Sequence, residues 1–351
     1  MQTITRKHPN VHPLLDVIDQ VYALTSDHDS ATIRLINPMY DKSFKVLFDV
    51  FAIFGIERYA VDLTDIHYEP LECSGDEKNL ILAFSGGKDS IASAIKYKND
   101  GYNVHLYHLK HINRSLSDEF IMAQESAKLL GMPLYVDEIT LSGNNIWMEH
   151  PMKNMIIANG ALSYGVREGI GTRVAFGNYT TSLLEDNVFE RCAGDCMDMW
   201  DAYDDIIQRI IPDFKIMANL KNMGETLEII SEHDDLLASS ISCLCRHSLR
   251  PFRNNWVKEK FGVNLSKNRC GSCYKCCVEY IYLADHDKIE FNEAYYKYCL
   301  EKLYLVTRAE NTGIFSIEYL WDAYMFYPMG ESKLKTIRSA NMLLGGIKWD
   351  E

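Results

Sequence analysis

The hexapeptide "SGGKDS", from Ser85 to Ser90, has residue types and a spacing suited to binding a phosphate. It lies between an almost wholly apolar run that is typical of a buried strand and a pattern that is typical of a helix. Neither Gly86 nor Gly87 carries a Cβ atom, so the backbone can turn sharply there and approach a ligand closely. The first turn of the following helix directs its N–H groups and its positive dipole end at the same place, which favours an anion.

The four polar side chains of the hexapeptide each have a chemical task at such a site. Lys88 adds a cation, and Ser85 and Ser90 add hydroxyl donors. Asp89 is able to hold Mg²⁺ or to orient a water molecule. A simple turn would not require these side chains together. The spacing differs from that of both the G-x-x-x-x-G-K-S/T loop and the G-x-G-x-x-G loop, which excludes those two nucleotide-binding motifs.

A second cluster consists of cysteines, because six of the ten in the chain fall between positions 243 and 277. In a reducing compartment such clustering indicates a metal site rather than disulfides. Cys270, Cys273 and Cys276 follow a C-x-x-C-x-x-C spacing, with Cys277 adjacent, and this spacing aims several thiolates at one ion. The segment "SISCLCRH" supplies the candidates for a fourth ligand, which are Cys243 or Cys245, with His247 a distant third.

The cysteine spacing is compatible with two kinds of metal group. Four thiolates around tetrahedral Zn²⁺ form a closed site, which is a structural rather than a catalytic arrangement. Three or four thiolates also suit an iron–sulfur cluster. The spacing does not decide between zinc and iron–sulfur, nor whether Cys277 substitutes for Cys276.

The elements around the hexapeptide alternate as in parallel α/β folds. Strands are expected at 79–84, 103–109, 133–139 and 173–177, and helices at 90–100, 115–131 and 151–169. The region before them predicts a helix at 12–24, a strand at 31–38, a dense apolar element at 44–56 and a strand at 58–63. The region after them is helical and acidic from 186 to 235, cysteine-rich and loop-like from 240 to 280, and mostly helical to the end.

Composition and charge limit the classes of function. Hydrophobic residues make up 47% of the chain and charged residues 24%, which is ordinary for a folded protein in water. The formal net charge of −13 argues against a broad surface for duplex nucleic acid. The basic run from Arg246 to Lys275 leaves room for a local groove, although we favour a solvated surface that neutralises thiolates. With no apolar run of about 18 residues and no signal peptide, a cytoplasmic location is expected.

The hexapeptide, placed between a strand and a helix, closely resembles the signature of the PP-loop ATP pyrophosphatase superfamily. The resemblance implies that Ser85–Ser90 cradles the β- and γ-phosphates of ATP with Mg²⁺. An acceptor oxygen then attacks the α-phosphorus, which gives an adenylated intermediate and pyrophosphate. The resemblance implies catalytic roles for Lys88, Asp89 and Ser85 and an ATP-binding role for the whole hexapeptide.

The same resemblance implies positions for the rest of the nucleotide. The adenine would lie at the end of the strand that follows the loop's helix, where backbone groups near Leu109 read its edge. The stretch "VAFGNY" gives Gly177 and Asn178 a place beside the nucleotide. We interpret His108 and His111, three residues apart, as polar residues at a strand end rather than as metal ligands.

The loop combined with "SC" at Ser242–Cys243 and "CGSCYKC" at Cys270–Cys276 resembles the 7-cyano-7-deazaguanine synthases. This resemblance implies an enzyme that uses ATP and ammonia to convert a deazaguanine carboxylate into a nitrile. It also implies Zn²⁺ held by four cysteines, with Cys243 as the fourth ligand. The sequence departs from the family at Met197, where an arginine is usual, and at Val278 and Glu279, which follow the last cysteine where an arginine is usual. The gap between Cys243 and Cys270 is also longer than in the family.

Two other functions remain open from the sequence. One is a sulfurtransferase of the same superfamily that adenylates tRNA or DNA and delivers sulfur with iron–sulfur or persulfide chemistry. The other is a non-catalytic nucleotide-binding subunit of a larger complex, against which the intact Lys88 and Asp89 argue. The expected partners are ATP and a nucleobase-like small molecule, with a protein or tRNA acceptor and a homodimer left open, and no membrane.

The expected fold class is α/β, with a Rossmann-like parallel sheet of the adenine nucleotide α-hydrolase type and helices on both faces. A cysteine-rich zinc-knuckle segment, a small N-terminal α/β extension and a helical C-terminal tail complete it. The expected domains are the extension at 1–75, the ATP-binding domain at 76–240, the metal-binding segment at 241–280 and the helical region at 281–351.

Overall fold

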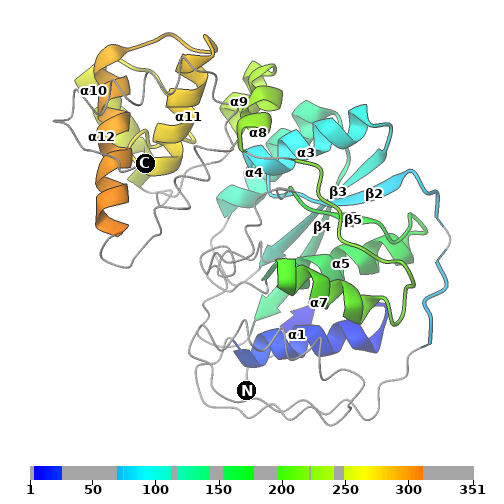
Figure 1. Ribbon diagram of the computed structural model, residues 1–351. Coiled ribbons are helices and arrows are strands. Elements are labelled where there is room, and N and C mark those ends of the chain that lie inside the picture. Colours follow the sequence, from blue (N-terminus) through cyan, green and yellow to red (C-terminus); the bar gives the residue numbers. More distant parts are fainter. Residues whose placement is uncertain are drawn as a thin grey trace, which may run out of the picture. The chain divides into compact units, whose positions relative to one another are not determined.

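The computed structural model describes residues 4–25, 69–73, 75–111, 117–141, 153–177, 197–220, 223–240 and 249–310 (Figure 1). The chain divides into two compact units. The first comprises Met1–Ser85 and Ser93–Asn219, and the second comprises Gly86–Ala92 and Leu220–Glu351. The predicted four-part domain organisation stays a prediction.

A five-stranded sheet forms the centre of the first unit. Its strands are β1 (Ile4–Arg6), β2 (Asn79–Ala83), β3 (Asn103–His111), β4 (Leu134–Leu141) and β5 (Val174–Ala175), in the order β1-β4-β3-β2-β5. The strands β2 to β5 pair in parallel, and β1 pairs antiparallel with β4 at one edge. The predicted α/β class with a parallel sheet is confirmed.

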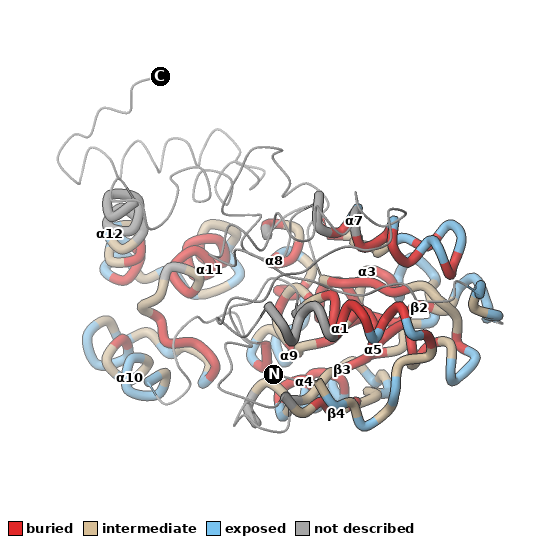
Figure 2. Tube along the Cα trace, turned by 90° about the horizontal axis from the view of Figure 1, so that it is seen from below, coloured by how far each residue is buried: buried red, intermediate tan, exposed pale blue. Residues whose placement is uncertain are grey.

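Helices cover both faces of this sheet, as the sequence predicts. They are α1 (Pro13–Thr25), α3 (Lys88–Asn99), α4 (Ser117–Leu130), α5 (Lys153–Arg167) and α7 (Met197–Ile207). In Figure 1, α3 and α4 lie on one side of the strands, and α1, α5 and α7 lie on the other. Figure 2 shows buried residues along α1, α5 and the strands between these two layers.

The strand β2 shows why this part of the sequence is so apolar. Its residues Leu80, Ile81, Leu82 and Ala83 are all buried. Ile81 and Ala83 belong to the core shared with α1, α5 and α7, and the alternation of side chains points Leu80 and Leu82 to the opposite face. A strand with a helical layer on each face has no solvent-exposed side, so polar residues are excluded from it.

The first N-terminal elements are part of the same unit. Arg6 of β1 forms a buried ion pair with Asp19 of α1, and the Asn159 amide of α5 donates to the same carboxylate at 2.8 Å. A buried ion pair is stable only when its remaining hydrogen-bonding capacity is satisfied. The Asn159 bond contributes to this and ties a strand and two helices together.

The second unit is helical in its described residues. Its helices are α8 (Met223–Ser231), α9 (Asp234–Ser239), α10 (Arg250–Phe261), α11 (Tyr274–Asp285) and α12 (Glu293–Glu310). The prediction of a loop-like segment from 240 to 280 was wrong, because this stretch contains α10 and the start of α11. Pro251 lies in the first turn of α10, and Gly262 ends the helix with a left-handed φ of 73°. A proline in the first turn and a glycine after the last turn are ordinary signals of a helix. The loop-like prediction followed from the cysteines and charges of the stretch instead.

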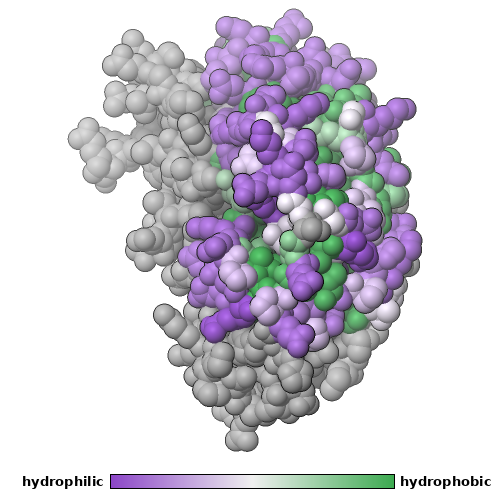
Figure 3. All heavy atoms as spheres, turned by 90° about the vertical axis from the view of Figure 1, so that its right-hand side faces the viewer, coloured by the Kyte–Doolittle hydropathy of each residue, from purple (hydrophilic) through white to green (hydrophobic). Residues whose placement is uncertain are grey.

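Some of the predicted elements lie outside the described residues. They are the elements expected at 31–38, 44–56 and 58–63 and the tail beyond 310. Within the described part of the chain, no helix has the length and apolarity required to span a bilayer. On the face of the molecule shown in Figure 3, most of the described surface residues are hydrophilic.

Candidate phosphate loop and thiolate centre

The hexapeptide leaves the sheet where its strand order reverses. From β2 the chain adds β3 and then β4 on one side, and it returns to place β5 on the other side of β2. In open α/β sheets, ligands bind outside the carboxyl ends of the strands at such a reversal. Gly86 has a φ of 73°, a left-handed conformation that glycine adopts without strain. The predicted need for glycine after the strand is therefore met at Gly86.

The charged side chains of the loop are held close to its backbone. The Lys88 ammonium donates to the Asp89 carboxylate, with 5% of the Lys88 side chain and 37% of the Asp89 side chain exposed. The Ser90 hydroxyl donates to the Gly87 carbonyl at 3.0 Å. Because α3 begins at Lys88, the positive end of its dipole lies at the same turn. The loop therefore combines a buried cation, a half-exposed carboxylate and a helix N-terminus within a few residues.

His108 supports the backbone immediately before the loop. Its Nδ1 lies 2.9 Å from the Phe84 carbonyl oxygen, and a carbonyl only accepts, so Nδ1 carries the proton. Burial lowers the pKa of His108, against the opposing effect of this hydrogen bond. The ring is therefore mostly neutral at pH 7, which fits the interpretation of His108 as a polar residue at a strand end. No pattern in the sequence predicts this hydrogen bond between His108 and the Phe84 carbonyl.

If the loop binds ATP, as the sequence resemblance implies, replacing His108 with phenylalanine is expected to raise the KM for ATP about fivefold, because one hydrogen bond that positions the loop is worth about 1 kcal/mol. The ring volume is kept while the Nδ1–H donor to the Phe84 carbonyl is lost. Pyrophosphate release as a function of ATP concentration measures the effect. The matched control is His105→Phe on the same strand, which should leave KM unchanged. Equal KM values for the wild type and His108→Phe would show that the bond does not position the loop.

Leu109 and Gly177 follow the strand ends that flank β2. The Tyr107 carbonyl accepts from the Phe84 N–H at 2.7 Å, just beyond the last β2 residue, Ala83. Backbone groups two residues apart on a strand point to the same edge, so those of Leu109 lie on this edge too, beyond the end of β2. Gly177 comes two residues after β5, which is the other neighbour of β2. Both predicted positions thus belong to the carboxyl ends of the sheet, whereas Asn178 lies outside the described residues.

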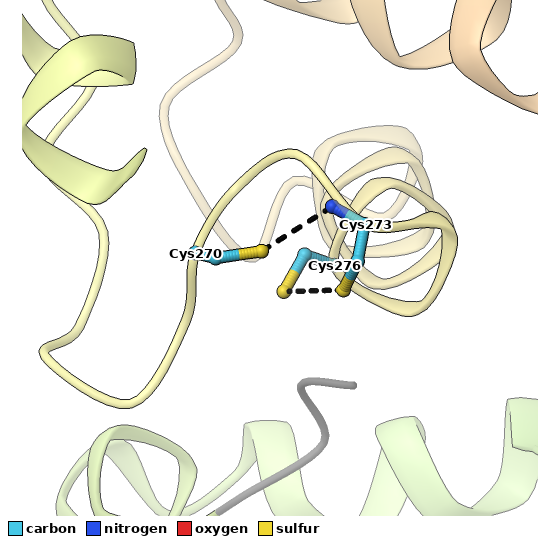
Figure 4. Close-up of side chains that lie close together, drawn as sticks. All are labelled: Cys270, Cys273 and Cys276. Atoms are coloured by element: carbon cyan, nitrogen blue, oxygen red, sulfur yellow. Dashed lines mark hydrogen bonds between the residues drawn. The ribbon is translucent and has the colours of Figure 1, made fainter. Parts of the chain in front are cut away.

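The sulfur atoms of Cys270, Cys273 and Cys276 converge in the second unit (Figure 4). All three lie within 4.8 Å of one another, and the Sγ atoms of Cys273 and Cys276 are 3.4 Å apart. The Cys270 sulfur accepts the Ser272 N–H at 3.4 Å and the Cys273 N–H at 3.3 Å. Cys273 occupies the N-cap position of α11, where the helix dipole is favourable to negative charge. The predicted spacing therefore brings three cysteine sulfur atoms together, with two backbone N–H groups and a helix N-terminus beside them.

Gly271 shapes the turn between the first two cysteines. Its φ is 67°, and a Cβ atom there would lie 2.4 Å from Leu265 Cδ1 and 2.9 Å from the Tyr295 hydroxyl. The buried Tyr295 hydroxyl donates to the Gly271 carbonyl at 2.7 Å. The turn is thus fixed both by its backbone conformation and by close packing.

Replacing Gly271 with alanine is expected to lower the free energy of unfolding by about 2–4 kcal/mol, because strain at positive φ adds to overpacking. The matched control is Gly262→Ala, since Gly262 has a φ of 73° but a Cβ atom added there would meet no atom within 4 Å. That control should cost only about 1 kcal/mol of conformational strain. Urea unfolding and metal content measure both variants, and equal losses for the two would contradict the packing argument.

A buried ion pair joins the two ends of the cysteine segment. Arg269, directly before Cys270, pairs with Glu279 of α11, and the two side chains are 8% and 2% exposed. Arg269 also donates to the Ser266 hydroxyl at 2.6 Å and to the Ser240 hydroxyl at 3.1 Å. Sequence reasoning noted Glu279 only as a departure from a family pattern. In the structure it is the partner that positions Arg269.

The neighbouring cysteines have another arrangement. Two main effects raise the pKa of the Cys277 thiol well above its usual range. The larger is a side-chain hydrogen bond with Cys299 of α12, and the smaller is burial. Cys277 therefore favours the protonated thiol, and the cluster of sulfur atoms contains Cys276 instead. The proposed fourth ligands Cys243, Cys245 and His247 lie outside the described residues.

The thiolate centre borders a cavity of about 370 Å³ within the second unit. Cys276 lines it together with the Arg269–Glu279 pair, Tyr280 and Asn292. A volume of this size is in the range of small-ligand sites. One of the three clustered cysteines thus belongs to the wall of a cavity of small-ligand size.

Two solved structures are similar to parts of the chain. One is described as a predicted subunit of a tRNA methyltransferase from Methanocaldococcus jannaschii; it is 21% identical, covers 44% of this chain and 74% of its own, and has a TM-score of 0.28. The other is the U34-tRNA thiolase NcsA from Methanococcus maripaludis with its 4Fe-4S cluster; it is 17% identical, covers 72% of this chain and 82% of its own, and has a TM-score of 0.33.

These likenesses do not transfer an activity, because both TM-scores lie below 0.5. Neither structure is described as a 7-cyano-7-deazaguanine synthase. No protein-family model matches the chain, and no curated protein matches it. The resemblance to the PP-loop superfamily therefore rests on the hexapeptide and its position in the sheet. The resemblance to the synthases rests on the hexapeptide combined with the cysteine motifs.

Proposed function

We propose that the chain is an ATP-dependent enzyme of the PP-loop type that transfers AMP to an acceptor oxygen and releases pyrophosphate. The observation that carries this proposal is the position of Ser85–Ser90 after β2, at the reversal of strand order, with Gly86 in a left-handed conformation. A triphosphate placed there meets the N-terminus of α3 and the Lys88 ammonium. In this proposal, backbone groups of Leu109 contact the adenine and Gly177 lies beside the nucleotide.

The residues of the loop have distinct roles in the proposed reaction. The acceptor oxygen attacks the α-phosphorus, the bond from this phosphorus to the bridging oxygen breaks, and pyrophosphate leaves. Lys88, the loop amides and the Ser85 hydroxyl stabilise negative charge on the departing phosphates, while the Ser90 hydroxyl holds the loop through its bond to the Gly87 carbonyl. Asp89, the more exposed of the two charged residues, is the carboxylate that we assign to Mg²⁺. Catalysis then comes mainly from positioning and electrostatics.

For the second half of the reaction we favour sulfur transfer to a base of tRNA or DNA. A hydrosulfide replaces the adenylated oxygen of the base, so a C–S bond forms, the C–O bond breaks, and AMP leaves with that oxygen and without net oxidation. The supporting observation is that Cys276 lines the cavity of the second unit. A reactive metal site keeps an open position beside space for a substrate, and a cavity next to the cysteine cluster favours such a site over a closed structural one.

A second candidate is the conversion of a deazaguanine carboxylate into a nitrile with ammonia. Its supporting observation is the sulfur spacing of 3.4 Å between Cys273 and Cys276. Thiolates around one tetrahedral Zn²⁺ with bonds of 2.3 Å are about 3.8 Å apart, so this spacing fits a single ion. The metal therefore distinguishes the candidates, since zinc favours nitrile formation and iron with sulfide favours sulfur transfer.

The donor set of the thiolate centre fits either group. Cys270, Cys273 and Cys276 are soft ligands suited to zinc or to iron–sulfur clusters, and backbone N–H groups already donate to the Cys270 sulfur. A bound metal would supply positive charge that stabilises a thiolate or a hydrosulfide beside the cavity.

The two candidates are tested side by side with the full chain purified without oxygen. One reaction contains ATP, Mg²⁺, hydrosulfide and bulk tRNA, and the other contains ATP, Mg²⁺, ammonium and a deazaguanine carboxylate. Mass spectrometry of the nucleosides and bases, with metal and sulfide analysis, reads the outcome. We expect a thionucleoside, AMP and iron with sulfide. A nitrile product together with zinc would contradict sulfur transfer and support the second candidate. ATP that is bound but not cleaved in both reactions would indicate a non-catalytic nucleotide-binding subunit.

A further inference from the structure

The exposed side of α10 carries an aromatic and basic surface in the second unit. Leu249, Phe252, Arg253, Trp256 and Lys260 recur at helical spacing on one face, which we call the α10 face. Val257 follows Trp256 in the sequence, so it points about 100° away from that ring, and it is buried. Phe252 and Arg253 are exposed on this face, whereas Trp256 is half-buried and packs against Tyr298 of α12.

Phe252 is the most exposed large hydrophobic residue in the described part of the chain. Its exposed fraction is 74%, and that of its neighbour Leu249 is 45%. A single exposed ring is common on protein surfaces, but this ring is next to Arg253 and one helical turn from Trp256. An aromatic ring with cations beside it offers a stacking surface and a charge at the same place.

Lysines lie over the aromatic rings between α10 and α12. The Lys260 ammonium is 4.9 Å from the centre of the Trp256 ring and 6.0 Å from that of Tyr298 in α12. The Lys302 ammonium is 5.6 Å from the Tyr298 ring. These cation–π contacts hold the charges at the surface in a fixed place. The α10 face thus continues onto α12 as alternating rings and cations.

The charge of this segment is opposite to that of the chain. Between positions 250 and 275 there are seven lysines and arginines and one acidic residue, Glu259, whereas the formal net charge of the chain is −13. Arg269 is buried in its ion pair, but Arg253 and Lys260 of the α10 face are exposed. A local concentration of exposed cations on an acidic protein selects an anionic partner for this face.

The α10 face also adjoins the thiolate centre. The Arg253 guanidinium donates to the Ser272 hydroxyl at 3.5 Å, and this hydroxyl donates to the Cys270 sulfur at 3.6 Å. A partner on the face therefore lies within reach of the cysteine turn.

We propose that the α10 face binds a single-stranded segment of nucleic acid, with bases stacked on Phe252 and phosphates at Arg253 and Lys260. Single strands offer unpaired ring faces and a chain of negative charge together, which is what exposed rings alternating with cations recognise. From Phe252 to Lys260 the helix rises about 12 Å, which suits a segment of a few nucleotides. A membrane surface is disfavoured, because a helix that lies in a membrane surface needs a broad apolar face. Among the described residues of α10 and its N-cap, two large apolar residues are exposed, Leu249 and Phe252. The role of this strand as the acceptor of sulfur transfer rests on the proposed function. Its binding to the α10 face does not require ATP.

Fluorescence polarisation of labelled 15-nucleotide single strands of RNA and DNA, without ATP, tests the proposal. Phe252→Ala is expected to weaken binding roughly tenfold, the order of one base-stacking contact. Arg253→Gln with Lys260→Gln should also weaken it and reduce the slope of log affinity against log salt by about 1.4, or about 0.7 for each phosphate contact. The matched controls are Ile121→Ala and Lys128→Gln, exposed residues of α4, which should bind as the wild type does. Melting temperatures confirm that each variant folds.

The proposal is overturned if the wild type binds neither single strand, if duplex DNA or anionic vesicles bind more tightly than single strands, or if the α10 variants bind as tightly as the controls. The Lys88→Ala variant separates this result from the proposed function. It is expected to retain strand binding and lose ATP cleavage. A wild type that cleaves ATP to AMP and pyrophosphate but binds no strand would overturn the surface and leave the adenylation intact.

Discussion

Replacing Lys88 with alanine is expected to lower the rate of pyrophosphate release from ATP by about a hundredfold to a thousandfold, as when one charge-stabilising donor is removed from an active site. The Lys88 side chain is 5% exposed and its ammonium donates to Asp89. Such a buried cation adds a stronger interaction with the phosphates than an exposed one, because water does not screen it. Pyrophosphate release at saturating ATP gives the change in kcat.

The control for this variant lies on the same helix. Lys98→Ala removes an exposed lysine from the last turn of α3 and should leave the rate unchanged. Lys88→Arg keeps the charge but changes its geometry, so we expect an intermediate rate. A wild-type rate for Lys88→Ala, in a variant that folds and binds ATP, would contradict the assignment of the loop.

Replacing Cys273 with serine is expected to lower metal retention and to destabilise the second unit. Cys273 lies between the other two cysteines, with its sulfur 3.4 Å from that of Cys276 and its N–H donating to the Cys270 sulfur. Metal binding to thiolates contributes directly to folding, so the loss of one ligand lowers both metal content and thermal stability. We expect metal content to fall at least about tenfold, since changes in the outer shell alone already cost 10–100-fold in affinity.

Metal analysis after gel filtration and a thermal melt measure this variant. Cys73→Ser is the matched control, because Cys73 is exposed and belongs to the first unit. It should retain both the metal and the melting temperature. Full metal content in Cys273→Ser would contradict the thiolate centre, and a lower melting temperature without metal loss would assign Cys273 to packing alone.

The fold of the first unit could be predicted because its signals are local. The apolar run of β2, the glycines after it and the periodic helix that follows each depend on neighbours in sequence. The structure confirms the strand at 79–83 and the helix at 88–99, with the helix beginning two residues earlier than expected. The C-x-x-C-x-x-C spacing is equally local, and it brings the three cysteines together as expected.

The residues that support these sites could not be predicted, because their partners lie far away in the sequence. His108 contacts the carbonyl of Phe84, and Tyr295 fixes the turn at Gly271 from another helix. Likewise, Cys277 has its partner Cys299 twenty-two positions later. Such pairs follow from tertiary packing, and a single sequence carries no local pattern for them. For the segment of the α10 face, the sequence predicts only a basic run. Its aromatic residues share one side with the cations only when the segment is helical.

The central claim is that ATP is cleaved at the α-phosphorus, and the products of labelled ATP test it most directly. The full chain is incubated with Mg²⁺, bulk tRNA and hydrosulfide, together with ATP labelled at the α-phosphate in one sample and at the γ-phosphate in another. The account predicts labelled AMP in the first sample and labelled pyrophosphate in the second, in equal amounts, with both lost in Lys88→Ala. Labelled ADP in the first sample and labelled inorganic phosphate in the second would contradict it.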